Sequence, residues 1–336
     1  MKEALFYTRE AQGVRCSLCP QACLIADGSS GNCRVRRNTG GRLIAETYGR
    51  VSSMHPDPIE KKPLYHFHPG SSILSLGTLG CNLHCRYCQN HSISQAGTDD
   101  LPLLSYRSPD EIVNQARTME GNLGIAFTYN EPTVWIEFML DIAGPAKGAG
   151  LKTIVVSNGY ILPEPLDRML EVTDAFNIDL KGFTGDFYRK VTFASLSPVL
   201  DTLVRIRSAG LHLELTCLIV PGLNDNPDIF RDILTWICDT LGEDTPLHLS
   251  RYFPTYRMNL PPTPLHTLTG LHSLASERMP YVYIGNAGYQ EKGRDTHCAR
   301  CGTLAIRREG YQTEVPGLDA GGFCLNCGTR VAERHK

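Results

Sequence analysis

The chain has 336 residues, of which 42% are hydrophobic and 20% are charged, as expected for a globular protein with one large domain and appendages or two medium domains. Its 33 Lys and Arg against 35 Asp and Glu give a net charge of -2, so neither nucleic acid nor a membrane is expected as a partner. No stretch approaches the roughly 18 uninterrupted apolar residues of a membrane span. The N-terminus has acidic residues where a signal peptide would carry its apolar region. We therefore expect a cytoplasmic protein.

Most of the thirteen cysteines lie in three close groups, which suggest a Cys-rich segment at 1–60, a central region at 61–290 and a tail at 291–336. In a chain without a signal peptide, cysteines spaced this closely ligate metal more often than they form disulfides. The remaining two, Cys217 and Cys238, lie in apolar patterns and are predicted as small core residues.

The first cysteine group lies in a segment with little hydrophobic periodicity, which could not bury much core without a metal. Its members are Cys16, Cys19, Cys23 and Cys33. We interpret them as a metal site, for zinc or for an auxiliary iron–sulfur cluster; the Cys-Pro step is similar to that of clostridial-type ferredoxins, but the spacing is not. Four free thiols are the alternative.

The central region alternates short apolar runs with amphipathic stretches, a pattern that predicts strands connected by helices. Ser108, Pro109 and Glu111 supply an N-cap, an N1 proline and a capping box for the first helix. Six strand–helix units predict an α/β fold with an open partial barrel, and a doubly wound sheet is the alternative. The predicted strands are 72–77, 124–129, 152–157, 175–180, 212–219 and 247–252, and the later helices are 132–148, 164–173, 198–209, 227–241 and 264–279.

The second cysteine group, Cys81, Cys85 and Cys88, follows the first predicted strand in the string GCNLHCRYCQN. Three thiolates on a cubane cluster leave one iron without a protein ligand and free to bind a small molecule. A structural zinc site would need a fourth ligand, and His84 or His91 is the alternative that would supply it.

The Cys-x3-Cys-x2-Cys spacing with an aromatic residue, Tyr87, before the last cysteine resembles the radical S-adenosylmethionine (SAM) superfamily, whose fold is a partial (β/α)6 barrel. The strings GTLGCNLHCRYCQN, TYNEP at 128–132, VSNGY at 156–160 and DLKGF at 179–183 are similar to those of pyruvate formate-lyase activating enzymes. The resemblance implies a [4Fe–4S] cluster on the three cysteines and SAM as the second cofactor. The cofactor-binding residues that it implies are Tyr87, Asn130, Glu131, Ser157, Asn158, Asp179 and Lys181.

The roles of these residues follow from the same resemblance. Asn130 and Glu131 stand where the family has a Gly-Gly-Glu motif that holds the amino group of SAM, and an acidic side chain can accept hydrogen bonds from an ammonium group. Ser157 and Asn158 are expected near the ribose, and Asp179 with Lys181 near the methionine carboxylate or the substrate. An ordinary turn at Asn158 and a solvated strand end at Asp179 are the alternatives.

The third cysteine group pairs Cys298 and Cys301 with Cys324 and Cys327, each pair being followed by glycine. This spacing predicts four thiolates around one tetrahedral ion in a zinc-ribbon-like tail. Zinc is the expected ion, and rubredoxin-type iron is the alternative. The ion would hold together a tail that is poor in core residues.

The N-terminal string CSLCPQACLIADGSSGNCRVRRNTGG, the segment KKPLYHFHPG and the tail together resemble the radical SAM protein of the AmmeMemoRadiSam system. This resemblance implies AMMECR- and Memo-domain proteins as partners, and the chemistry implies an electron donor of the flavodoxin or ferredoxin class. We expect an oxygen-sensitive enzyme in which a 5′-deoxyadenosyl radical abstracts hydrogen from a substrate. The alternatives are a glycyl-radical-enzyme activating enzyme and, from another class, a metal-binding interaction module.

Overall fold

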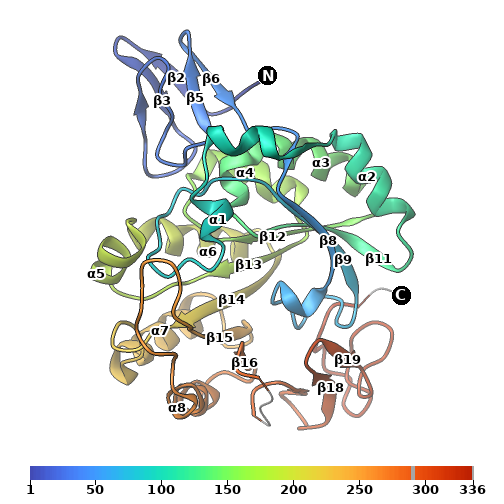
Figure 1. The fold of residues 1–336 in the computed structure, drawn as a ribbon. Coiled ribbons are helices and arrows are strands. Elements are labelled where there is room, and N and C mark those ends of the chain that lie inside the picture. Colours follow the sequence, from blue (N-terminus) through green and yellow to red (C-terminus); the bar gives the residue numbers. More distant parts are fainter. Residues whose placement is uncertain (289–291, 335–336) are drawn as a thin grey trace.

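The computed structural model describes residues 1–288 and 292–334, and its centre is an eight-stranded sheet (Figure 1). Seven strands are parallel neighbours in chain order, and β8 pairs antiparallel with β9 at the edge. All six predicted strands are confirmed, and β8 and β16 extend the sheet at its two edges. The strands are β8 (Ser53–Pro58), β9 (Ser72–Gly77), β11 (Asn122–Phe127), β12 (Lys152–Ser157), β13 (Ala175–Asp179), β14 (His212–Ile219), β15 (Leu247–Arg251) and β16 (Val282–Gly285).

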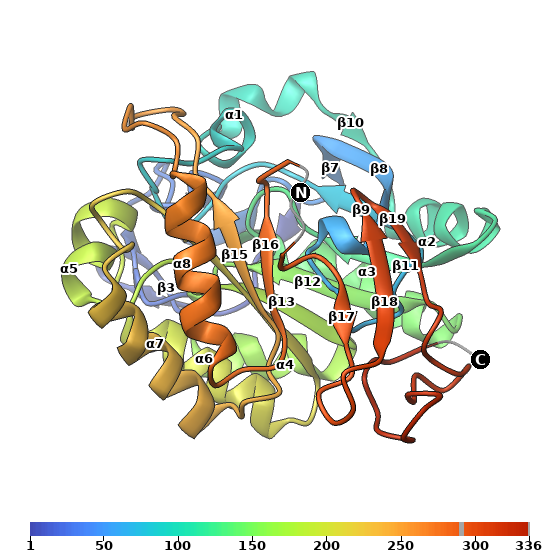
Figure 2. The same cartoon turned by 90° about the horizontal axis from the view of Figure 1, so that it is seen from below.

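The long helices follow one another around the outside of the curved sheet (Figure 2), each contacting its neighbour or the strands beside it. Helices on one face only exclude the doubly wound alternative, which needs helices on both faces. The capping box is present as predicted, because Ser108 accepts from the Glu111 amide and Glu111 accepts from the Ser108 amide. The helices are α2 (Pro109–Thr118), α3 (Ile136–Gly148), α4 (Pro163–Val172), α6 (Ser197–Ser208), α7 (Pro227–Thr240) and α8 (Leu265–Ser276).

The end of the barrel where the strands begin is closed by residues 63–68, which we call the floor segment. Glu214 of β14 accepts hydrogen bonds from the backbone amides of Tyr65 and His66, at 3.0 and 2.7 Å. Asn177 of β13 donates to the carbonyl of Pro63 at 2.7 Å. His248 of β15 binds the same Glu214 carboxylate at 2.6 Å, so polar residues of three strands hold this segment.

The N-terminal segment forms two small antiparallel sheets that share the main core with the barrel. Across this contact Arg36 forms a buried ion pair with Glu137 of α3, in which Nη1 donates to both carboxylate oxygens, at 2.9 and 3.0 Å. Strand β8 lies within the 1–60 range yet belongs to the barrel sheet. The small strands are β1 (Lys2–Glu3), β2 (Tyr7–Glu10), β3 (Gly13–Cys16), β4 (Leu24–Ile25), β5 (Arg36–Thr39) and β6 (Arg42–Ala45), and β7 (Arg50–Val51) pairs with β10 (Ser105–Tyr106).

The tail packs on the floor segment, at the opposite end of the molecule from the N-terminal strands (Figure 1). The backbone of Glu333 accepts from the His68 amide at 2.8 Å and donates to the His66 carbonyl at 2.7 Å. The guanidinium of Arg308 lies 4.0 Å from the centre of the Tyr65 ring. Within the described residues, no helix combines the length and the apolar character needed to cross a membrane. The tail strands are β17 (Thr296–His297), β18 (Leu304–Glu309) and β19 (Gln312–Glu314).

The remaining elements are short and connect the larger ones. They are η1 (Ile59–Lys61), α1 (His91–Ser94), η2 (Thr98–Leu103), η3 (Pro132–Trp135), α5 (Gly185–Phe187) and η4 (Tyr188–Thr192). Two of them begin at strings that the sequence singles out as cofactor sites: α1 begins directly after GCNLHCRYCQN, and η3 begins at the last residue of TYNEP.

Candidate functional site

The loop that carries Cys81, Cys85 and Cys88 runs from β9 to α1, at the carboxyl edge of the parallel sheet. Parallel-sheet enzymes place their chemistry at this edge. Gly80, just before the first thiol, has a φ of +86° and lies so close to the N-terminal segment that a Cβ would be 2.7 Å from the Cys33 carbonyl oxygen. Only glycine fits there without strain, and the loop therefore lies directly against the N-terminal segment.

The sulfurs of this loop accept or share hydrogen bonds, as thiolates of iron–sulfur clusters do. The Leu83 amide donates to Cys81 Sγ at 3.4 Å, and Ser94 Oγ lies 3.0 Å from Cys88 Sγ. Burial raises the pKa of Cys85 to about 12, although Lys181 opposes that shift. A bound metal would favour the deprotonated thiolate that the buried site otherwise disfavours.

The structure does not support a single-ion site completed by histidine. The two ring nitrogens of His84 bind the side chains of Gln95 and Asn32, at 2.8 and 2.9 Å. The His91 ring stacks on Tyr256, with Nδ1 3.3 Å from the Cys88 carbonyl. The three thiols are not mutually within 4.8 Å, so they lack the closed spacing of one tetrahedral ion; in a cubane each thiolate would bind a different iron.

Glu131 lies beside this loop, 2% exposed, and its carboxylate accepts three hydrogen bonds. Oε1 accepts from the Thr133 amide at 3.0 Å and from Ser157 Oγ at 2.8 Å, and Oε2 accepts from the Asn158 amide at 2.9 Å. Burial raises the pKa of Glu131, and its charge contributes to a raised pKa at Cys81. A carboxylate has about four acceptor positions, so one on Oε2 remains for a ligand.

The side chains of Asn130 and Asn158 hold the cysteine loop in place. Asn130 accepts from the Thr78 amide at 3.0 Å and donates to the Gly80 carbonyl at 2.9 Å. Asn158 Nδ2 lies 3.6 Å from Cys81 Sγ and 2.9 Å from Asn82 Oδ1. Both residues therefore lie at the three-thiol site, with side chains engaged by the protein.

Lys181 forms an ion pair with Asp179 at 2.7 Å, and the Tyr87 ring is buried nearby. Burial alone would lower the pKa of Lys181, but Asp179 and the Cys85 thiolate outweigh it and raise the pKa. The Tyr87 hydroxyl is buried without a hydrogen-bond partner among the described residues. A buried unpaired hydroxyl is costly, which fits a polar ligand group at this position.

Asn82 is a site residue that the sequence analysis does not single out. Its Oδ1 accepts from Asn158, and its Nδ2 donates to the Tyr160 carbonyl at 2.6 Å. It thus connects the cysteine loop to the segment after β12. Its place directly after the first cysteine of the motif is the one signal that the sequence offers.

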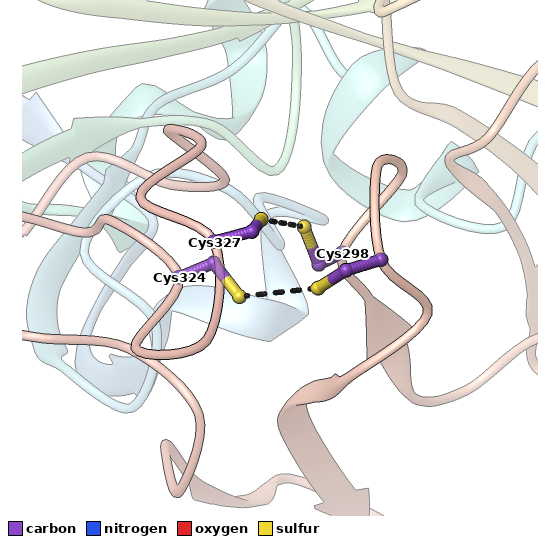
Figure 3. A group of neighbouring side chains, drawn as sticks. Cys298, Cys324 and Cys327 are labelled. Carbon is purple, nitrogen blue, oxygen red and sulfur yellow. Dashed lines mark hydrogen bonds between the residues drawn. The ribbon is translucent and has the colours of Figure 1, made fainter.

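The four tail cysteines come together as predicted (Figure 3). Their ligand atoms all lie within 4.8 Å of one another, with Cys298 Sγ 3.5 Å from Cys327 Sγ and Cys301 Sγ 3.6 Å from Cys324 Sγ. Four sulfurs at about 2.3 Å from one zinc ion would be about 3.8 Å apart. In each knuckle the amide of the following glycine donates to the carbonyl of the first cysteine, so the two loops have the same turn.

The N-terminal cysteines line one cavity, together with residues that include Arg36 and Asn82. Unlike the tail group, no three of these four sulfurs lie mutually within 4.8 Å.

The comparisons with known proteins agree with this geometry. The model of the Radical SAM superfamily matches residues 76–237. Protein MJ0808 of Methanocaldococcus jannaschii, which is uncharacterised, is 44% identical over 335 residues, covering 98% of this chain and 99% of that protein. The pyruvate formate-lyase-activating enzyme of Listeria monocytogenes is 25% identical over 160 residues, which are 44% of this chain and 62% of that enzyme, less than two thirds of its length.

Among solved structures, Streptococcus suis SuiB bound to S-adenosylmethionine has a TM-score of 0.52 at 11% identity, over 68% of this chain and 53% of that chain. A likeness at this identity shows a common fold. The partial barrel, the three-cysteine loop at its carboxyl edge and the match to the family model agree with one another. Through its residues 76–237, the chain belongs to the radical SAM superfamily.

Proposed function

We propose that the protein binds a [4Fe–4S] cluster on Cys81, Cys85 and Cys88 and reductively cleaves SAM to a 5′-deoxyadenosyl radical, which abstracts hydrogen from an organic substrate. The observation that carries this proposal is a buried carboxylate, Glu131, that lies beside the three thiols and has no cationic partner within the described part of the chain.

Among the described residues, no Lys, Arg or His forms an ion pair with Glu131. Its three hydrogen bonds come from neutral donors, which leave the negative charge uncompensated in a buried site. An ammonium group would supply both the missing charge and a donor for the free acceptor position of Oε2. SAM carries such a group at its methionine end. The three thiols would hold the iron to which the other polar groups of that methionine end bind.

The residues around the three thiols would position the cofactor. Asn130 and Asn158 hold the loop, the Tyr87 hydroxyl has no partner among the described residues and can bind a polar group, and Asp179 with Lys181 places a half-buried pair of charges near Cys85. When bound, the cluster supplies one electron for cleavage of the sulfonium bond.

The decisive experiment is anaerobic reconstitution with iron and sulfide, followed by dithionite and SAM, with 5′-deoxyadenosine measured by liquid chromatography and mass spectrometry. Wild type should produce it and Cys85→Ala should not, whereas Cys238→Ala, outside the three cysteine groups, should match wild type. Equal product from Cys85→Ala, or turnover in air by protein without iron, would contradict the proposal.

A second candidate is activation of a glycyl radical enzyme. The similarity to pyruvate formate-lyase-activating enzymes over 160 residues supports it. In that case the substrate is a glycine within a partner protein. Deuterium from labelled glycine in the partner should then appear in 5′-deoxyadenosine, and label from a small molecule would instead exclude the activating role.

We further propose that a flavodoxin- or ferredoxin-class protein supplies the electron in the cytoplasm, and that AMMECR- and Memo-domain proteins act with this enzyme. All thirteen cysteines are free thiols in the structure, which suits a reducing compartment. Co-purification with tagged AMMECR- and Memo-domain proteins tests the association. If this protein does not co-purify with them, the association is contradicted.

A further inference from the structure

The cavity in the N-terminal segment is lined by all four cysteines of that segment. Cys16 ends β3, Cys19 and Cys23 lie in the loop to β4, and Cys33 lies shortly before β5. Three of these thiols are buried and Cys23 is half-buried. The fold thus brings four soft metal ligands, from the end of one strand and from two loops, to one cavity.

The spacing of the sulfurs separates the N-terminal group from the single-ion site of the tail. The tail group closes to 3.5 and 3.6 Å, as one zinc ion requires, whereas no three N-terminal sulfurs lie mutually within 4.8 Å. The three thiols of the barrel loop are likewise not mutually within 4.8 Å. Within one molecule, the N-terminal group therefore lacks the closed spacing of the single-ion site.

Arg36 gives an independent indication that the cavity holds an anionic group. Its side chain lines the cavity and is 1% exposed, and its Nε has no hydrogen-bond partner among the described residues. Its other nitrogens are engaged by Glu137 and the Leu5 carbonyl. A cubane with four thiolate ligands is an anion whose sulfides accept hydrogen bonds, and it would satisfy the unpaired Nε–H.

We propose that Cys16, Cys19, Cys23 and Cys33 bind a second [4Fe–4S] cluster. Four thiolates occupy all four irons, so this cluster has no open position for SAM or substrate. The Asn32 amide already donates to Cys23 Sγ at 3.4 Å, the kind of hydrogen bond that adjusts the potential of such clusters. The proposal concerns a site separate from the three-thiol loop and does not depend on SAM cleavage.

The second site is adjacent to the first. Asn82, the neighbour of Cys81, lines the cavity, and its carbonyl accepts from Gln21 Nε2 at 3.0 Å. His84 of the three-thiol loop binds Asn32 of the N-terminal loop. Because the two loops are in direct contact, paramagnetic clusters bound at both sites should couple magnetically when both are reduced.

The test uses the full chain with Cys81, Cys85 and Cys88 all replaced by Ala, reconstituted anaerobically. We expect about four irons and four sulfides to remain per chain, as one [4Fe–4S] cluster requires. Adding Cys16→Ser and Cys19→Ser should remove them, whereas adding Cys238→Ser should not. The proposal would be overturned if the N-terminal group held zinc without sulfide. It would also be overturned if the chain held no iron while its circular dichroism matched that of wild type.

A second measurement covers the case in which the multiple variants fold poorly. Electron paramagnetic resonance of reduced wild type should show broadened, interacting signals, and the single variant Cys23→Ser at the half-buried ligand should alter or remove that interaction. The second site would be refuted if wild type contained iron and sulfide for a single cluster and showed one uncoupled signal that Cys23→Ser leaves unchanged. Loss of SAM cleavage with both signals present would instead refute the proposed function alone.

Discussion

Replacing Glu131 with Gln removes the charge at the proposed ammonium site while nearly preserving the shape of the side chain. One amide oxygen can keep the hydrogen bonds from Thr133 and Ser157, but the amide nitrogen would then face the Asn158 amide, donor against donor. The unsatisfied amide costs about 1–3 kcal/mol. Because burial raises the pKa of Glu131, removing its charge offsets part of that cost, and we expect only a modest loss of folding stability.

The effect on ligand binding should be larger. A hydrogen bond to a charged group contributes about 1.5–3 kcal/mol, so its loss should raise the dissociation constant of SAM by about 10- to 150-fold. Anaerobic isothermal titration calorimetry of the reconstituted protein measures this directly. Iron content should stay at the wild-type level, because Glu131 is not a cluster ligand in the proposed site.

Glu60 offers a matched control for this experiment. It is also a buried glutamate whose pKa is raised by burial, and it accepts hydrogen bonds from Gly70 and Thr313 near the floor segment. Glu60→Gln should leave the affinity for SAM unchanged. If Glu131→Gln and Glu60→Gln bind SAM as tightly as wild type, Glu131 is not the ammonium ligand and the reasoning from its uncompensated charge is wrong.

Three further predictions follow from contacts away from this carboxylate. Glu137→Gln leaves the Arg36 charge buried without its partner and should lower the free energy of unfolding by about 3–5 kcal/mol in urea, whereas a loss under 1 kcal/mol would show that the pair contributes little. Burial alone would lower the pKa of His212, but Glu214 and Glu333 raise it to about 9, so its stabilisation is complete below pH 6.5 and is lost as the pH rises through about 9. Between pH 7 and 10, wild type should lose about 2 kcal/mol more than His212→Gln, and parallel pH profiles would contradict this. Cys327→Ala should release one zinc ion per chain and make the tail sensitive to protease while the iron content stays constant; retained zinc would exclude the tail site.

Much of the fold is predictable because its signals are local. Apolar runs of five or six residues between amphipathic stretches indicate the buried parallel strands, and the capping box at Ser108 fixes where α2 begins. The edge strand β8 is not predicted, since SMHPDP contains two prolines and few apolar residues. Such a strand is tolerated only at the edge of a sheet, where one side of its backbone needs no partner.

The site is predictable in its thiols and less so in its polar residues. The spacing of three cysteines in eight residues is a local property, but the hydrogen bonds that join Glu131 to Ser157 and Asn158 connect separate strands. The role of Asn130 in holding Gly80 likewise depends on the path of the loop. For the N-terminal cysteines, the sequence leaves zinc and a cluster open, because the distances between sulfurs depend on how the end of β3 and two loops pack.

The contact between the floor segment and the tail has a consequence for synthesis of the protein. His66 Nδ1 lies 2.6 Å from the carbonyl of Val331, across 265 residues of sequence. The floor segment leaves the ribosome early and must wait for nearly the whole chain before this partner emerges. During that interval the polar residues of the barrel floor, including Glu214, lack part of their final surroundings. Nascent chains stalled before residue 331 should therefore be more open to protease at the floor segment than the released protein, which makes this end of the barrel a natural point of engagement for a chaperone.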